Sequence, residues 1–289
     1  MTRRFTLTPY LFLAPALALI GVFVLWPIMA VVYFSFTEWD IVRPPVWTGL
    51  ANYEQLVADP TFWKALTNSL VYLLVTPTII ALSIGLAIIV NRRLRGINIY
   101  RALYFVPAVS GSIAIGIAWR FLFDRNGFLN GLLISAGIIK IPIQWLSEPS
   151  MVLPIAMLLT IWAGIGYYSV IFVAGLQNIP EHLYDAAKVD GAGSLALFRN
   201  ITLPGLRPTL LFVSVTTIIG TFRVFAQIIV MTNNSGGPFD STRSLVMHLY
   251  QTGFQFFRMG GASAVAWVLF IIILGFTIAQ FQMQRGSAD

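Results

Sequence analysis

The sequence predicts an all-α integral membrane protein with six transmembrane helices. Only 10% of its 289 residues are charged and 57% are hydrophobic, whereas a soluble domain carries about 25% charged residues. A helix needs about 20 mostly apolar residues to cross a bilayer, and six stretches qualify. Five of them, 5–37, 65–91, 102–119, 149–180 and 259–284, hold no Asp, Glu, Lys or Arg, and the sixth, 208–232, is interrupted only by Arg223.

The first stretch has two interpretations, a cleaved signal peptide or a retained helix. Arg3 and Arg4 precede it, and Ala14-Pro15-Ala16 loosely imitates a cleavage site. The apolar core of a signal peptide has about 7–15 residues, but this run continues to Phe36. Its length favours a retained first transmembrane helix.

The charge distribution predicts the orientation. Six spans put both termini on one side, and short cytoplasmic segments carry an excess of Lys and Arg. With both termini inside, 10 cations fall in the inside segments 1–8, 91–101, 177–208 and the tail after Met283, and fewer fall in the longer outside loops. We therefore predict a multi-pass membrane protein with both termini cytoplasmic. This topology divides the chain into a first helix and periplasmic loop (1–64), a five-helix core (65–283) and a short tail (284–289).

A seventh uncharged window, 126–139, is too short to span a bilayer. It has 14 residues, three of them glycine. We expect an interfacial or re-entrant helix there.

The polar segment 177–208 lies between two apolar stretches and predicts a helical hairpin. Asn178 and Glu181 have the spacing of a capping box, and a helix can run from there to about Asp190. Gly191 can end this helix in the left-handed conformation that glycine adopts most readily. Ser194 can cap a second short helix, from Leu195 to about Ile201.

The surface of this hairpin suits contact with another protein better than contact with lipid. Ala186 and Ala187 allow close approach, and Leu195, Leu197 and Phe198 have no obvious cover within the chain. A helix lying on lipid headgroups is expected to carry Lys and Arg on its polar face. The first arm carries Glu181, Asp185 and Asp190 instead, so protein docking is favoured over the lipid-surface alternative.

The hairpin resembles the EAA loop of permease subunits in binding-protein-dependent ABC importers. Asp185-Ala186-Ala187, Gly191, Ile201 and Leu203-Pro204 match that loop, with every gap equal. Asp185 replaces the family's Glu, which keeps the charge and shortens its reach. The likeness covers essentially the whole chain, and IPEHLYDAAKVDGA and VMTNNSGGPFDSTRSLVMHLYQTGF look like the carbohydrate-uptake (maltose or glycerol-3-phosphate-like) branch.

The resemblance implies a type I ABC importer permease fold, a location in the bacterial plasma (inner) membrane and a set of partners. These are a second homologous permease subunit, two ATP-binding subunits, an extracytoplasmic solute-binding protein and the lipid bilayer. The solute would be a sugar or a related polyol or glycerophospho-type compound. The residues implied in coupling to the ATPase are Asp185, Ala186, Ala187, Asp190, Gly191, Leu195, Phe198, Leu203 and Pro204.

Signatures of catalysis and of bound cofactors are absent from the sequence. There is no cysteine and there are only two histidines, which excludes thiolate metal sites and disulfides. None of the lysines follows a glycine in a phosphate-binding loop. We therefore expect no catalytic, cofactor or metal site, no nucleic-acid partner, and ATP hydrolysis on a separate subunit.

Polar and aromatic residues within the spans are candidates for a solute pathway. An arginine at the membrane centre costs about 2.5–3.5 kcal/mol on insertion scales, so Arg223 should face protein or water. It either lines the pathway or anchors neighbouring helices. Gln227 is one turn further on. Aromatic faces can stack on sugar rings, although each such side chain can also serve only in packing. The further candidates are the aromatic residues Tyr167, Tyr168 and Trp162, together with the polar residue Asn68.

Two other functions remain as alternatives. A self-sufficient secondary transporter or channel is expected to carry acids within its spans, and none of the 11 acids lies in a predicted span. A membrane-embedded enzyme is expected to carry a catalytic constellation, which the sequence lacks. Co-purification with an ATPase separates the importer permease from both.

Overall fold

The computed structural model describes residues 8–91, 96–233 and 235–285. The regular secondary structure of this part of the chain is helical apart from two short strands. Its contacts group it into two compact units, Met1–Pro60 with His248–Ile271, and Thr61–Met247 with Ile272–Asp289. This grouping follows packing. The division at residue 64 predicted from the sequence follows topology and stays a prediction.

The first unit begins with a long apolar helix made of α1 (Thr8–Ile20), η1 (Gly21–Leu25) and α2 (Trp26–Ser35). The turn η1 is a π-helix, and in it the N–H of Trp26 bonds to the carbonyl of Gly21. Pro27 lacks an N–H and its ring disturbs the α-helical ladder. The wider turn before it lets the helix continue. Within Tyr10–Ser35 the most apolar window has no buried residue.

The rest of the first unit consists of two short strands, a helix and a segment that returns from the end of the chain. Strands β1 (Thr37–Glu38) and β2 (Val46–Trp47) pair antiparallel, with Thr37 opposite Trp47. Helix α3 (Ala51–Ala58) follows, and the chain returns through η4 (Gln251–Gln255) and the first turns of α16 (Met259–Arg285).

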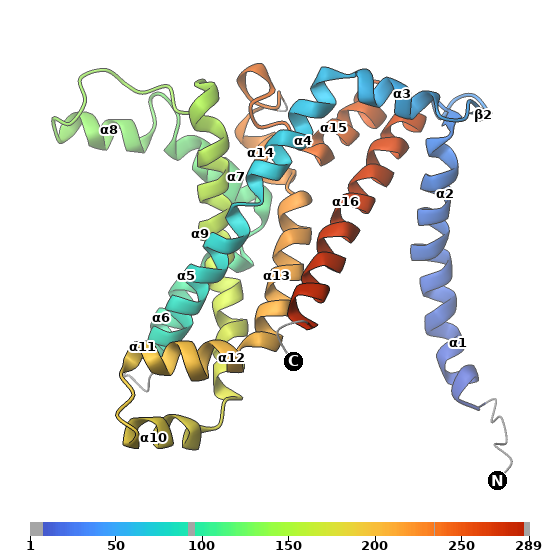
Figure 1. The fold of residues 1–289 in the computed structure, drawn as a ribbon. Coiled ribbons are helices and arrows are strands. Elements are labelled where there is room, and N and C mark those ends of the chain that lie inside the picture. The colour runs from blue at the N-terminus through green and yellow to red at the C-terminus, as the bar shows by residue number, and fades with distance from the viewer. Residues whose placement is uncertain (1–7, 92–95, 234, 286–289) are drawn as a thin grey trace, which may run out of the picture. The chain divides into compact units, whose positions relative to one another are not determined.

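The second unit is built around α9 (Pro149–Gln177), the longest helix of the described chain. Helices α5 (Val75–Val90), α6 (Ile97–Val109) and α13 (Arg207–Phe222) pack on α9, and α7 (Ser112–Leu122) packs on α14 (Ala226–Met231) (Figure 1). Close approach needs small side chains, because a Cβ on Gly166 would lie 2.1 Å from the backbone oxygen of Tyr104. The unit also contains α4 (Pro60–Tyr72), α8 (Phe128–Ser135), the short helices between α9 and α13, and the start of α15 (Leu245–Tyr250).

The spans predicted from the sequence are present, but two of them are interrupted. The stretch 102–119 is not one straight helix, because α6 and α7 meet at an angle of 96°. Pro107 lies in the last turn of α6, and Ser110 and Gly111 are extended. The described chain therefore has five helices that can cross a membrane, or six if the bent pair counts as one span.

The stretch 208–232 is also interrupted. Helix α13 ends at Phe222 and α14 starts at Ala226. Phe225 has φ −153° and ψ −59°, outside the helical region. Neither glycine nor proline lies at this break, which sits within the apolar stretch.

The window 126–139 contains the short helix α8. Its buried side chain Asn130 accepts hydrogen bonds from the N–H of Ile143 and from Nε1 of Trp145, and donates to the carbonyl of Ile143 at 2.8 Å. One amide thus fastens the loop that follows α8.

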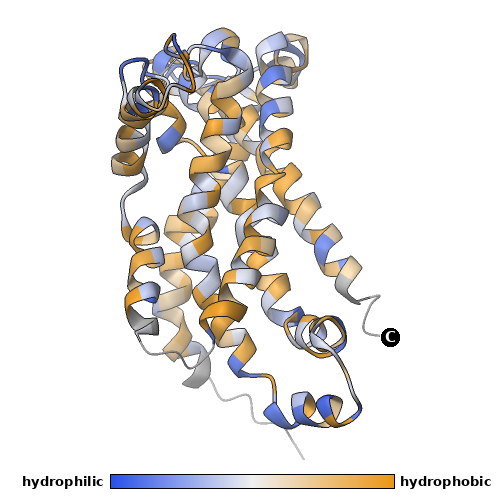
Figure 2. Ribbon diagram, turned by 90° about the vertical axis from the view of Figure 1, so that its left-hand side faces the viewer, coloured by the Kyte–Doolittle hydropathy of each residue, from blue (hydrophilic) through white to orange (hydrophobic). Residues whose placement is uncertain are grey.

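Hydropathy follows this architecture. The long helices are mostly orange in Figure 2, whereas the hairpin around α10 (Glu181–Val189) carries several blue segments. Figure 1 places α8 and α10 at opposite ends of α9 within the second unit.

Candidate functional site

The hairpin that follows α9 is the first candidate site. It consists of α10, α11 (Ser194–Leu197), the π-turn η2 (Phe198–Thr202) and α12 (Leu203–Gly205), and it leads into α13. Two details of the predicted capping are wrong. Pro180 is the N-cap of α10, Gly193 is that of α11, and neither helix has a side-chain cap hydrogen bond. The first helix ends at Val189, one residue before the predicted end.

The end of α10 explains the spacing between the two alanines and the glycine. Gly191 has φ +78°, as predicted for a left-handed cap. Its N–H bonds to the carbonyl of Lys188, and the N–H of Ala192 bonds to that of Ala187. These two bonds form a Schellman motif, in which three residues separate the first acceptor from the left-handed glycine. The spacing is therefore the geometry of one helix end.

The second arm is held to the first by specific contacts. The hydroxyls of Tyr184 and Thr202 lie 3.0 Å apart in a hydrogen bond. A Cβ on Gly205 would lie 2.7 Å from Cδ1 of Ile179, so the chain entering α13 packs closely on the chain leaving α9. The turn η2 precedes Pro204 just as η1 precedes Pro27. The arms are thus fixed relative to the membrane helices of this unit.

The predicted coupling residues divide into exposed and covered ones. The side chain of Leu195 is 79% exposed, and that of Leu203 is 37% exposed. Phe198, predicted to lack cover, instead packs against a buried cluster that includes Phe172 and Leu206. Asp185 forms an exposed ion pair with Lys188 at 3.0 Å. The others are exposed or half-buried on the same hairpin, and they are Ala186, Ala187, Asp190, Gly191 and Pro204.

A cavity among the membrane helices of the second unit is the second candidate site. It has a volume of about 250 Å³. It lies where α6 bends into α7 and where α13 gives way to α14, so the two interrupted spans both open onto it. Its polar and aromatic lining comprises Ser110, Ser112, Thr160, Tyr167, Tyr168, Thr217, Thr221 and Gln227.

A chain of hydrogen bonds fixes one wall of this cavity. Nε2 of Gln227 donates to the hydroxyl of Thr160 at 3.1 Å. That hydroxyl lies 2.6 Å from the hydroxyl of Tyr72, which also bonds to the carbonyl of Ala156. The amide of Gln227 is therefore held in place rather than free to rotate. Thr160 and Tyr72 were missed in the sequence analysis, because single hydroxyls in apolar helices have no distinguishing pattern.

The cavity brings together half of the predicted pathway residues. Gln227, Tyr167 and Tyr168 line it, and the side chain of Tyr167 is 49% exposed. Trp162 does not line it and packs against Trp119, with ring centroids 5.7 Å apart.

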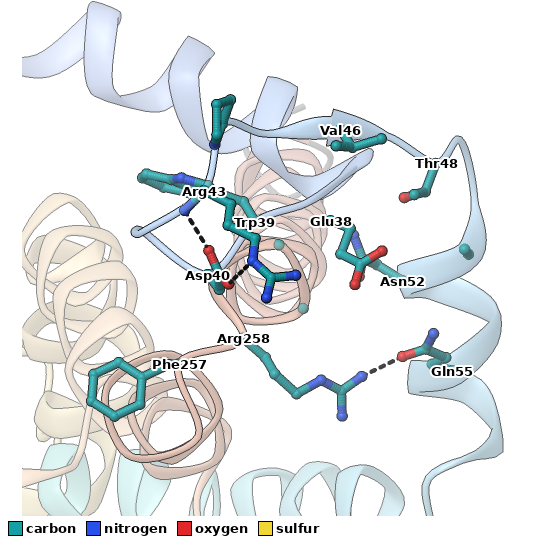
Figure 3. A pocket seen from close by; sticks show the side chains of 14 residues that line it. Glu38, Trp39, Asp40, Arg43, Val46, Thr48, Asn52, Gln55, Phe257 and Arg258 are labelled. Carbon is teal, nitrogen blue, oxygen red and sulfur yellow. Dashed lines mark hydrogen bonds and ion pairs between the residues drawn. The ribbon is translucent and has the colours of Figure 1, made fainter.

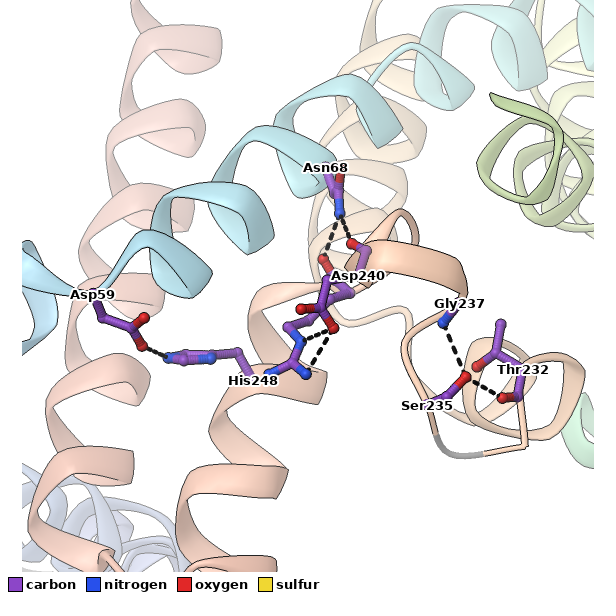
Figure 4. A network of polar contacts seen from close by, with 8 residues as sticks. Asp59, Asn68, Thr232, Ser235, Gly237, Asp240 and His248 are labelled. Atoms are coloured by element: carbon purple, nitrogen blue, oxygen red, sulfur yellow. Dashed lines mark hydrogen bonds and ion pairs between the residues drawn. The ribbon is translucent and has the colours of Figure 1, made fainter. Parts of the chain in front are cut away.

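Arg223 and Asn68 also lie outside the cavity lining. Arg223 occupies the break between α13 and α14, where it is exposed and where its side chain makes no hydrogen bond or ion pair with other described residues. Asn68 is buried, and its amide donates to the carbonyls of Asp240 and Arg243 at 2.8 and 3.0 Å (Figure 4). It thereby fastens the loop after α14.

No metal site accompanies either candidate. Among the residues whose placement is described, no group of three or more His, Asp or Glu side chains could hold an ion.

Comparisons with known proteins agree with this architecture. Residues 3–286 match the family described as binding-protein-dependent transport system inner membrane component. The chain is 33% identical to the lactose transport system permease protein LacF of Rhizobium radiobacter, over 99% of this chain and 96% of that protein. It is 38% identical to the arabinooligosaccharides transport system permease protein AraP of Bacillus subtilis (strain 168), over 92% and 85%.

A solved structure shows the same fold. The match is to a bacterial ABC transporter involved in the import of the acidic polysaccharide alginate, with a TM-score of 0.82 and 21% identity. It covers 96% of this chain and 95% of that one. The chain therefore belongs to the family of binding-protein-dependent transport system inner membrane components, and it is a membrane-spanning permease.

Proposed function

We propose that this permease carries a sugar into the cell as one subunit of an ATP-driven importer. The relatives named for lactose and arabinooligosaccharides support a sugar, and the lining of the cavity suits one. Sugar hydroxyls both donate and accept hydrogen bonds, as do tyrosine, serine and threonine hydroxyls and the amide of Gln227. The rings of Tyr167 and Tyr168 add flat apolar surface.

The single observation that carries the coupling role is the rigid, exposed hairpin. Its left-handed cap at Gly191 sets the angle between the arms, and the bond between Tyr184 and Thr202 keeps them together. Because Gly205 packs on Ile179, a push on the hairpin is transmitted to the ends of both α9 and α13. Both helices line the cavity, so movement of the hairpin would change the cavity.

The proposed partners follow from this arrangement. Two ATP-binding subunits would each receive such a hairpin on the cytoplasmic side, and a homologous second permease would complete the pathway. A solute-binding protein would deliver the sugar from outside. A solved ABC transporter in the same fold group was crystallised with a pentasaccharide-bound periplasmic protein. The proposed cellular location is the bacterial inner membrane, with both termini of the chain in the cytoplasm.

The test is uptake by the reconstituted complex. Proteoliposomes should accumulate labelled sugar only when ATP is enclosed with the ATPase subunits and when loaded binding protein is present. A panel of sugars tested for thermal stabilisation of the binding protein would identify the solute. Accumulation by the permease alone, driven by a proton or sodium gradient, would favour the secondary transporter.

A further inference from the structure

The cavity of about 250 Å³ in the second unit, here called the membrane cavity, has a polar but uncharged lining. Among the described residues that line it, none is Asp, Glu, Lys, Arg or His. A cavity of about 340 Å³ in the first unit differs in this respect, because its lining includes Glu38, Asp40, Arg43 and Arg258 (Figure 3). The membrane cavity must therefore select a solute by shape and by the direction of hydrogen bonds.

Three hydroxyls that line the membrane cavity have already donated their hydrogens. Oγ of Ser110, Oγ1 of Thr217 and Oγ1 of Thr221 each donate to a carbonyl of their own helix, at 2.9, 2.6 and 2.8 Å. A hydroxyl has one hydrogen and two lone pairs. Each of the three can therefore only accept a hydrogen bond from a solute.

The hydroxyl of Thr160 is also committed as an acceptor, by its contacts with Tyr72 and Ala156. The two hydroxyl oxygens lie 2.6 Å apart, and the carbonyl of Ala156 lies 2.8 Å from that of Tyr72 and 3.1 Å from that of Thr160. One hydroxyl hydrogen lies between the two oxygens and the other lies on the carbonyl. In both possible arrangements the hydrogen of Thr160 points at Tyr72 or at Ala156, and its oxygen is left to accept.

This commitment fixes the orientation of the Gln227 amide. Nε2 of Gln227 donates to Oγ1 of Thr160 at 3.1 Å. The reverse orientation would bring the amide oxygen to Thr160 and would need the hydrogen of that hydroxyl, so one hydrogen bond of the network would be lost. The network therefore favours the orientation in which Oε1 of Gln227, an acceptor, is the atom left for a solute.

The remaining features of the lining do not reverse this preference for acceptors. Helices α6 and α13 end at the cavity, and α7 and α14 begin there, so two helix ends of each sign meet and their partial charges oppose one another. The hydroxyls of Ser112, Tyr167 and Tyr168 make no hydrogen bond with described residues. They can donate or accept equally. The lining as a whole offers more acceptors than donors.

We propose that Tyr72 is a positioning residue for solute selectivity. By committing the hydrogen of Thr160, it holds Oε1 of Gln227 available to the solute, and the acceptor-rich lining takes a neutral solute that donates hydroxyl hydrogens. A carboxylate or phosphate only accepts hydrogen bonds, and it would lose its hydration here without a positive partner. This inference rests on the proposed function, because it needs the membrane cavity to be the sugar site. It favours a neutral sugar over a glycerophospho-type compound.

The test measures solute binding to the complex of permease and ATPase subunits in nanodiscs. The binding protein is left out, so that its own selectivity does not enter. The probes are glucose and galactose with their C6 acids, glucuronate and galacturonate, and saturation-transfer NMR gives each Kd. The parent should bind the neutral sugars at least about tenfold more tightly than the acids, because an unpaired charge costs more than one hydrogen bond.

Two substitutions remove the commitment of Thr160 by different means. Tyr72→Phe and Thr160→Val should each lower the preference for neutral sugars about fivefold, the effect of one hydrogen bond, because the Gln227 amide can then turn its N–H groups to a carboxylate. Thr160→Ser keeps the hydroxyl and should keep the parent preference. The matched control is Ser169→Ala, which removes a buried hydroxyl of α9 that bonds to a helix carbonyl and does not line the cavity.

The ratio of the two Kd values separates positioning from a merely structural role. A structural role would weaken neutral and acidic probes alike and leave the ratio unchanged, so an unchanged ratio in Tyr72→Phe and Thr160→Val would overturn the inference. Equal binding of sugars and acids by the parent would overturn it as well and leave a sugar importer of another selectivity. If the parent binds none of the four probes, the membrane cavity is not the sugar site and the inference falls. Only the failure of ATP-driven uptake in proteoliposomes would remove the proposed function itself.

Discussion

At the residue scale, the hydroxyl of Tyr167 is the clearest candidate contact for a solute. It lines the cavity, it is half-exposed, and its hydroxyl makes no hydrogen bond with described residues. Tyr168 lines the same cavity but packs edge-on against Tyr167, with ring centroids 5.1 Å apart. The amide of Gln227 is already bound to Thr160, so it offers its oxygen in a fixed direction.

Tyr167→Phe is therefore expected to raise the KM for sugar uptake about five- to tenfold, which corresponds to one hydrogen bond of about 1–1.5 kcal/mol. Because only one oxygen is removed, packing stays the same. Tyr100→Phe is the control, since Tyr100 is 64% exposed on α6 and does not line the cavity. Uptake kinetics in proteoliposomes measure both. Equal KM values would remove Tyr167 from the pathway.

Arg223 poses a different question, because its charge lies at a break in an apolar stretch. Replacing it with Leu removes a group that costs about 2.5–3.5 kcal/mol at the membrane centre, so insertion should stay equal or improve. We expect uptake to fall at least about tenfold, and Arg223→Lys to restore part of it because the charge returns. Membrane levels and uptake rates are measured side by side. Normal uptake by Arg223→Leu would assign the residue to packing.

At the element scale, the structure could be predicted where a long apolar run or a glycine in a polar segment decides it, and not where a break lies inside an apolar stretch. Apolar length predicted the spans, and the glycine at 191 predicted the left-handed cap. The bend between α6 and α7 was missed, because Pro107 and Ser110-Gly111 lie inside a window whose mean hydropathy still suits a span. The break at Arg223–Phe225 has no glycine or proline to mark it. Hydrogen bonds such as that between Tyr72 and Thr160 depend on tertiary packing.

The helix end at Gly191 offers a test of the hairpin as one element. A Cβ at Gly191 or at Gly193 would meet no atom within 4 Å, so space is equal at both. Only φ differs, +78° at Gly191 and −74° at Gly193. Alanine at 191 must adopt a left-handed conformation that costs about 1–2 kcal/mol, whereas alanine at 193 needs none. Gly191→Ala should reduce the stimulation of ATPase activity by loaded binding protein, and Gly193→Ala should not. Equal stimulation would mean that the cap does not set coupling.

At the scale of the whole molecule, the predicted orientation assigns the hairpin and the segment that holds β1 and β2 to opposite sides of the membrane. The cation asymmetry predicts the hairpin inside and the loops around β1 and β2 outside. The chain has no cysteine, so single cysteines report position without background. The choice of positions follows from exposure, since a reagent cannot reach a buried side chain. Ser241 would be a poor reporter because it is 8% exposed, whereas Val42 is 89% exposed and Ser194 lies on the exposed hairpin.

The expected outcome is that a membrane-impermeant thiol reagent labels Val42→Cys on intact spheroplasts and labels Ser194→Cys only after the membrane is opened. The physical reason is that cations within about 15–20 residues of a span end resist translocation. Labelling after detergent serves as the control that both cysteines are reactive. The reverse pattern would place the hairpin outside, where no ATPase could reach it. It would then remove the coupling role of the hairpin, because that role needs the cytoplasmic side of the membrane.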